Sequence, residues 1–122
     1  KGKKNYASSN INNRAESRDL QLAYTFDHYC QKYFLTHFSV KDIARKMNIS
    51  AKYLSEIVSK ITGKKALAIL NQYRINYAKG LLLQTNMTPT QIAYELNFEN
   101  PGYFFTFFKK ATGLTPLQFR QI

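Results

Sequence analysis

The sequence of 122 residues predicts an all-α fold of about seven helices, arranged as two similar lobes joined by a long central helix. Three observations support this prediction. Residues 40–63 recur in altered form as residues 89–113, and residues 66–85 between the two copies carry apolar side chains at helical spacing. The length suits one compact unit or two small packed lobes.

The two copies align along their whole length. The matched pairs of the first part, at an offset of 49, are Ile43/Ile92, Ala44/Ala93, Met47/Leu96, Asn48/Asn97 and Ile49/Phe98. After one inserted residue the offset is 50, and the pairs are Tyr53/Tyr103, Leu54/Phe104, Ile57/Phe107, Val58/Phe108, Lys60/Lys110, Thr62/Thr112 and Gly63/Gly113. A periodic array needs at least three copies, so two copies indicate a duplicated module.

The first copy reads as a short helix, a turn and a longer helix. Ser39 and Ser50 are placed to cap the two helices, because a serine oxygen accepts from the free amides of a first turn. Asn48 suits the corner between them, since asparagine enters the left-handed region at low cost. Gly63 is expected to end the longer helix in the same region.

The second copy repeats these signals with other residues. Asn97 takes the corner, Asn100 the cap of the longer helix and Gly113 its end. Pro101 follows the cap at the first helical position, where its missing N–H is no loss.

The spacing within each copy favours a helix-turn-helix. A small residue such as Ala44 lets the second helix cross closely, while Leu54 and Ile57 fill the angle between the helices. An ordinary helical hairpin is the alternative for a single copy. Two matched copies in a basic chain favour two helix-turn-helix lobes.

Three further helices are predicted around the copies. The first runs from Asp19, as its cap, to about Thr36. The central helix spans about residues 66–85, with an apolar stripe of Leu67, Leu70, Tyr73, Tyr77, Ala78 and Leu81 that can dock on both lobes. Arg74 lies beside this stripe and is expected to form an ion pair or to contact a phosphate. A last short helix opens at Thr115-Pro116, with Leu117 and Phe119 facing inward and Arg120 outward.

Charge favours a polyanionic partner. The chain has 18 Lys and Arg against 7 Asp and Glu, a net charge of +11. It has no signal-peptide pattern and no apolar run near the ~18 residues of a membrane span, so no membrane association is expected. The single cysteine, Cys30, fits a reducing cytoplasm and is expected to be a small buried hydrophobe.

No catalytic or metal-binding constellation is predicted. His28 and His37 have no third ligand-type neighbour at metal spacing and are expected to be surface or packing residues. We therefore expect no enzymatic activity, no cofactor and no metal.

The chain from about Leu20 to Arg120 resembles the DNA-binding domain of the AraC/XylS transcription regulators. The most specific segments are IAYELNF (92–98), YFFTFFKKATG (103–113), Thr115-Pro116 and Phe119-Arg120. The segment with Tyr73-Arg74, Ala78 and Leu81-Leu82 resembles the central helix of the family. This resemblance implies a homeodomain-like, bi-lobed fold.

By the same resemblance, the function is sequence-specific binding of double-stranded DNA. Recognition helices at about residues 51–62 and 101–112 enter adjacent major grooves. The positions that match the base-contacting residues of the family are Lys52, Ser55, Glu56, Gly102, Phe105 and Thr106. Many members carry arginine at the positions of Glu56 and Thr106, so strong bidentate reading of guanine is not expected here.

The side chains on these helices allow limited forecasts. Lys52 can donate to guanine, and Glu56 can accept from the cytosine amine or form a salt bridge with Lys60 or Lys52. Phe105 either contacts thymine methyl groups or packs against the last helix.

Groups that flank the recognition helices are expected to bind phosphates. They are Lys41, Ser50, Lys60, Lys64, Asn100, Lys109 and Lys110. Because each neutralised phosphate releases counterions, binding should depend steeply on salt.

The expected organisation is a linker over residues 1–17, a first lobe with the central helix over 18–84 and a second lobe over 85–122. The resemblance implies a bacterial, cytoplasmic activator that contacts RNA polymerase, with a sensory or dimerisation domain before this segment. Two alternatives are a basic RNA-binding or protein-docking bundle and the regulatory part of an alkyl-transfer DNA repair protein. The Pro-Cys-His-Arg nucleophile motif of the latter is absent.

Overall fold

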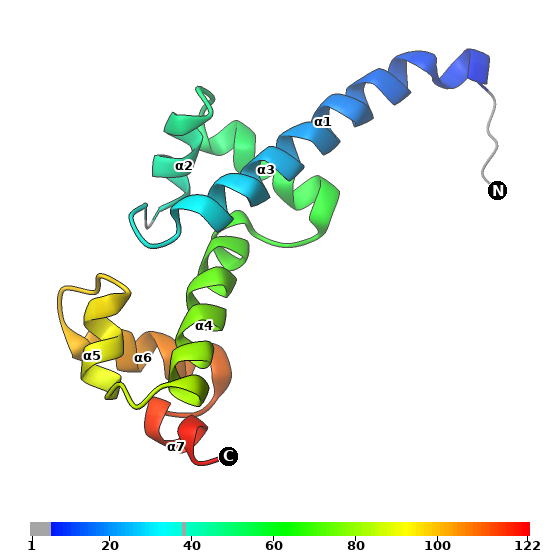
Figure 1. The fold of residues 1–122 in the computed structure, drawn as a ribbon. Helices are drawn as coiled ribbons and strands as arrows, with labels where there is room; N and C mark the ends of the chain where they lie inside the picture. The colour runs from blue at the N-terminus through cyan, green and yellow to red at the C-terminus, as the bar shows by residue number, and fades with distance from the viewer. Residues whose placement is uncertain (1–5, 38) are drawn as a thin grey trace.

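The computed structural model describes the backbone of residues 6–37 and 39–122, with side chains described from residue 14 onward. Within these ranges the chain forms seven α-helices and no strand, which confirms the predicted fold class (Figure 1). The helices are α1 (Tyr6–Tyr33), α2 (Val40–Lys46), α3 (Ala51–Thr62), α4 (Ala66–Gln84), α5 (Pro89–Glu95), α6 (Pro101–Thr112) and α7 (Pro116–Arg120).

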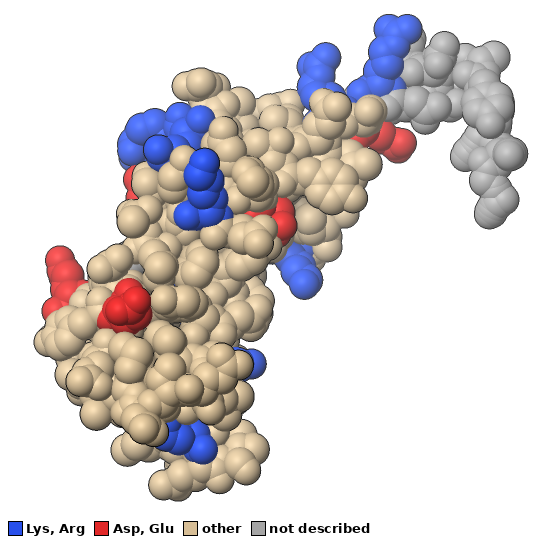
Figure 2. Space-filling view, in the orientation of Figure 1, with Lys and Arg blue, Asp and Glu red and all other residues tan. Residues whose placement is uncertain are grey.

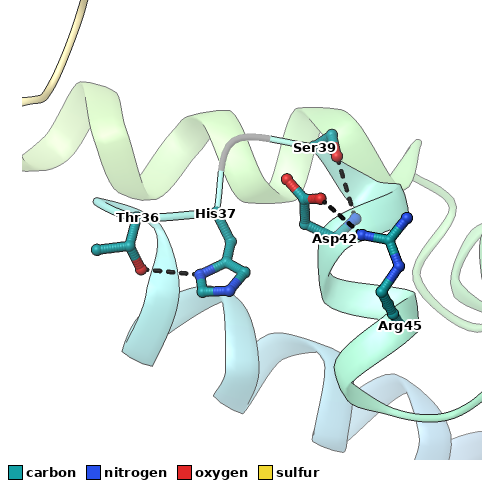
Figure 3. Close-up of polar contacts among 5 residues, drawn as sticks. All are labelled: Thr36, His37, Ser39, Asp42 and Arg45. Carbon is teal, nitrogen blue, oxygen red and sulfur yellow. Dashed lines mark hydrogen bonds and ion pairs between the residues drawn. The ribbon is translucent and has the colours of Figure 1, made fainter.

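The predicted caps form at the starts of α2, α3 and α6. The Ser39 hydroxyl accepts from the Asp42 amide at 3.0 Å, beside the Asp42–Arg45 ion pair (Figure 3). Ser50 accepts from the amide of Tyr53, and Asn100 accepts from the amide of Gly102 at 2.7 Å. These bonds satisfy orphan helix donors, so each helix begins where its capping residue stands.

The corner and end residues are also confirmed. Asn48 and Asn97 have φ of 60° and 64°, and they are the only non-glycine residues in the described chain with positive φ. Gly63 and Gly113 follow α3 and α6 with φ of 74° and 84°. The duplication in the sequence is therefore a duplication of backbone geometry.

Two separate hydrophobic cores share α4. Its N-terminal part contributes Ala66 and Leu70 to a core with α1, α2 and α3, which we call the first lobe. Its C-terminal part contributes Ala78 and Leu82 to a core with α5 and α6, the second lobe. The cores therefore divide within α4, and the boundary expected between residues 84 and 85 stays a prediction.

The turn after α1 joins the two lobes. Arg74 of α4 is only 5% exposed, and its Nε donates to the carbonyl of Phe34 at 3.3 Å. A second described bond of this guanidinium reaches the side-chain oxygen of Asn71. The side-chain amide of Asn97 donates to the carbonyl of Leu35 at 2.7 Å. Arg74 is thus structural, and both of its described oxygen partners are neutral.

The predicted start of the first helix is wrong. The backbone of residues 6–17 already lies within α1, ahead of the expected start at Asp19. The linker expected over residues 1–17 stays a prediction, and residues 1–5 lie outside the described residues. Asp19 is not a cap but a buried interior residue, bonded to Lys60 of α3 at 2.9 Å. Its residue type predicts a helix cap, but its carboxylate instead links α1 to α3.

Two predicted orientations in α7 are reversed. Leu117 is 57% exposed, whereas Arg120 turns back and donates to the carbonyls of Leu82 and Thr85 at 2.9 and 3.2 Å. These bonds cover carbonyl groups at the end of α4, which have no partner within their own helix.

The predicted stripe of the central helix is also incomplete. Leu67 is 48% exposed, while Ile75 and Leu82, which the stripe omitted, are buried. Because α4 is packed on two sides, a single stripe does not describe its buried surface.

The backbone geometry predicts opposite effects for two glycine substitutions. Gly113→Ala should lower the free energy of unfolding by about 1 kcal/mol, because an L-residue is strained at positive φ. Gly80→Ala, in the interior of α4 with open space around the added carbon, should raise it by about 0.5–1 kcal/mol. Urea denaturation of both variants measures this, and equal signs would contradict the assigned backbone.

Candidate nucleic-acid interface

One face of α3 carries the predicted base-contacting residues of the first lobe. Leu54 and Val58 are buried in the core, whereas Lys52 and Glu56 are exposed and Ser55 is half-buried. The helical period therefore places the three polar side chains on the solvent side of a helix whose other side is fixed by the core.

The same face recurs on α6 with different chemistry. Phe104 and Phe108 are buried, and Gly102, Phe105 and Thr106 are exposed. A Cβ added at Gly102 would lie 3.0 Å from the side-chain oxygen of the Asn100 cap, so this position is held small. Phe105 is 36% exposed, with its ring edge-on to Phe104 at 6.0 Å between ring centres.

The two faces belong to helices at the two ends of α4. In Figure 1, α3 passes behind α1 near one end of α4, and α6 passes behind α5 near the other end. A 19-residue α-helix is about 28 Å long, close to the ~34 Å that separates successive major-groove segments.

An ion pair holds one of the predicted phosphate ligands. The Lys60 ammonium lies 2.9 Å from the carboxylate of Asp19, and hydrogen bonding to this carboxylate raises the pKa of Lys60. The alternative salt bridge of Glu56 is not formed, because neither of the two ion pairs among the described residues includes it. Glu56 therefore stands on the exposed face with its charge available.

The remaining phosphate candidates fall into two groups. Ser50 and Asn100 each use a side-chain oxygen to cap the adjacent helix, which places them at the helix start but commits that acceptor. The exposed lysines are Lys41, Lys64, Lys109 and Lys110. None of these roles is tested by the packing, so they stay predictions.

The charge of the two lobes differs. Helix α2 carries Lys41, Arg45 and Lys46 against one acid, whereas α5 carries no basic residue and ends at Glu95. In Figure 2 basic side chains gather over α2, and acidic side chains lie around α5 and the loop after it. The first lobe therefore presents the more positive helix-turn-helix.

Tyr53 and Tyr103 are exposed aromatic residues that sequence reasoning did not assign to the interface. They occupy equivalent positions on α3 and α6, next to the recognition faces. Tyrosine at a position with the spacing of core residues does not by itself predict exposure. The occurrence of tyrosine at the same position of both copies is the one sequence feature that could have drawn attention to the pair.

Two residues with reactive chemistry are held in the fold. Cys30 is fully buried, and burial raises the pKa of its thiol to about 12, so it packs as predicted. The His37 ring lies 2.8 Å from the Thr36 hydroxyl (Figure 3), and His28 is exposed.

Among the described residues, no three His, Cys, Asp or Glu side chains could hold a metal ion together. No described helix is long and apolar enough to cross a bilayer.

Comparison with known proteins gives similarity over most of the chain. Residues 43–122 match the family model described as a helix-turn-helix domain. The bifunctional transcriptional activator/DNA repair enzyme AdaA of Bacillus subtilis is 34% identical over 77% of this chain and 44% of its own length. The chain spans only 14–55% of the curated relatives that it matches.

Solved structures show the same fold. The C-terminal domain of AraT, a response regulator from Geobacillus stearothermophilus, is 31% identical with a TM-score of 0.76, over 82% of this chain and 84% of that one. The DNA-binding domain of AdpA, solved with a target DNA, is 19% identical with a TM-score of 0.71, over 81% and 89%. With its duplicated lobes and shared α4, the chain belongs to the helix-turn-helix family of AraC/XylS-type transcription regulators.

Proposed function

We propose that this chain binds double-stranded DNA sequence-specifically, with α3 and α6 in two successive major-groove segments. The observation that carries the proposal is the repeated face, exposed on α3 and again on α6. The 19-residue helix α4 between them, about 28 Å long, is expected to set the two faces about one duplex turn apart. The AdpA domain, which has a similar fold, was solved in complex with a target DNA, and this supports DNA as the partner.

The two faces suit different bases. In the first lobe, Lys52 can donate to guanine and Glu56 can accept from the cytosine amine. In the second lobe, Phe105 and Thr106 offer mainly apolar contact, and Gly102 lets the duplex approach the backbone. The expected site is therefore gapped and non-palindromic, with thymine in the half that α6 reads.

The alternative that this chain is the regulatory part of an alkyl-transfer DNA repair protein is less well supported than a transcription regulator, although the bifunctional activator and repair enzyme AdaA is a relative. This chain would not itself supply the alkyl-accepting cysteine of such a protein. Transfer needs an accessible thiolate, and the one cysteine of the chain is Cys30, which is buried with a raised thiol pKa. A competition experiment distinguishes the proposal from the alternative of a basic RNA-binding bundle. Unlabelled duplex DNA should compete for binding to the chain far better than transfer RNA does.

We also propose a wider role for this chain. We expect the chain to act in the cytoplasm as the output module of a transcription activator that contacts RNA polymerase, joined to a sensory or dimerisation domain. The family of the chain supports this expectation. A selection from random duplexes tests the central proposal, and a motif with a single half or no enriched motif would contradict it.

Phe105→Ala should relax the preference for thymine in the half-site of the second lobe, because the ring is the largest apolar group on that face. The affinity for the selected duplex should fall about tenfold, because the variant no longer buries the apolar ring against the thymine methyl group. Selection with the variant measures this. Tyr24→Ala, an exposed aromatic of α1, is the control, and an unchanged motif in both would assign Phe105 to packing beside α7.

Lys109→Ala should weaken binding to all duplexes alike and lower the slope of log affinity against log salt by about one. Lys60→Ala should change the slope by less, because Asp19 already holds the Lys60 ammonium. Fluorescence anisotropy titrations at several salt concentrations compare the two. An equal loss of slope would show that the ion pair opens on DNA.

A further inference from the structure

A hollow lies beside the recognition face of the first lobe. It is lined by the exposed side of α3, including Ser55 and Glu56, and by the residues that begin the next helix, Lys65 and Leu67. Val40, at the start of α2, also lines it. The hollow is therefore an extension of the predicted base-reading face rather than a separate surface.

The second lobe carries the same hollow. It is lined by Phe105 of α6, by Thr115 and Leu117 at the start of α7, and by Pro89 at the start of α5. These residues are the counterparts of those in the first lobe at the repeat offsets, with 40, 55, 65 and 67 matching 89, 105, 115 and 117. An adjoining hollow continues along α6 past Lys109 and Lys110.

Each hollow has an exposed leucine on its rim. Leu67 is 48% exposed and Leu117 is 57% exposed, although both stand where a helix packs against its lobe. The residues just before them, Ala66 and Pro116, are buried. One exposed leucine needs no explanation. The same exposure at matched positions of two diverged copies calls for a shared contact.

We propose that each hollow holds the deoxyribose–phosphate strand that borders the major groove entered by α3 or α6, with Leu67 and Leu117 packed on the sugars. This inference rests on the proposed function and adds a second set of contacts to it. It assigns the two leucines and the preceding Lys65 and Thr115 to DNA binding.

The chemistry of the hollows fits this occupant. A strand of duplex DNA alternates anionic phosphates with largely apolar sugar faces, so it needs both cations and apolar groups. The first hollow pairs Leu67 with Lys65, and the second pairs Leu117 with the lysines at the end of α6. Each hollow adjoins a base-reading face. When the recognition helix lies in the major groove, the part of the duplex nearest the hollow is therefore the strand at the edge of that groove.

The test uses Leu67→Ala and Leu117→Ala, which remove the contact while keeping a good helix former. Leu83→Ala is the matched control, because Leu83 is 61% exposed on α4 and lines neither hollow. Each test variant should bind the selected duplex about fivefold more weakly, and the double variant about 25-fold, while the control binds as the parent does. Circular dichroism confirms that all four variants are folded.

Hydroxyl-radical footprinting locates the loss, because the radical attacks exposed deoxyribose. Leu67→Ala should lose sugar protection only beside the half-site of α3, and Leu117→Ala only beside that of α6. Affinities and footprints equal to those of Leu83→Ala would overturn this inference and leave the proposed function standing. Failure of the parent chain to bind any duplex would instead contradict the proposed function.

Discussion

The fold depends on one helix that belongs to two hydrophobic cores. Helix α4 buries Leu70 in the first lobe and Leu82 in the second, so neither lobe can move without disturbing a packed surface of the other. Burial lowers the pKa of Arg74 to about 10, yet the guanidinium stays charged at neutral pH and binds the carbonyl of Phe34. Because the same turn also accepts from Asn97, the lobes are joined by hydrogen bonds as well as by packing.

Duplication explains how one chain presents two candidate recognition helices. The cores of the copies keep their apolar residues, while the exposed faces diverge from Lys52, Ser55 and Glu56 to Gly102, Phe105 and Thr106. The supporting charge diverges too, since α2 is basic and α5 is not. We therefore expect the first lobe to contribute more phosphate attraction and the second lobe more apolar contact with DNA.

Local signals made the fold predictable, and long-range partners limited the prediction. Ser39, Asn48 and their counterparts act on amides or dihedral angles within a few residues, so their roles could be inferred from residue type and spacing. Asp19 resembled a cap because its partner, Lys60, is 41 residues away. Arg120 was expected outside because the carbonyls that it reaches belong to α4. The candidate faces followed from the repeat offset, but the exposed leucines depend on how the helices pack.

The fixed spacing of α3 and α6 is most directly tested by changing the spacing of the two half-sites in the DNA. Duplexes that carry the selected site, with about five base pairs inserted between its halves, turn the second half-site to the opposite face of the helix. If α4 holds α3 and α6 at a fixed separation, affinity falls to that of a duplex with a single half-site. Equal affinity for the original and the lengthened duplex would show that the lobes move independently and would contradict the account.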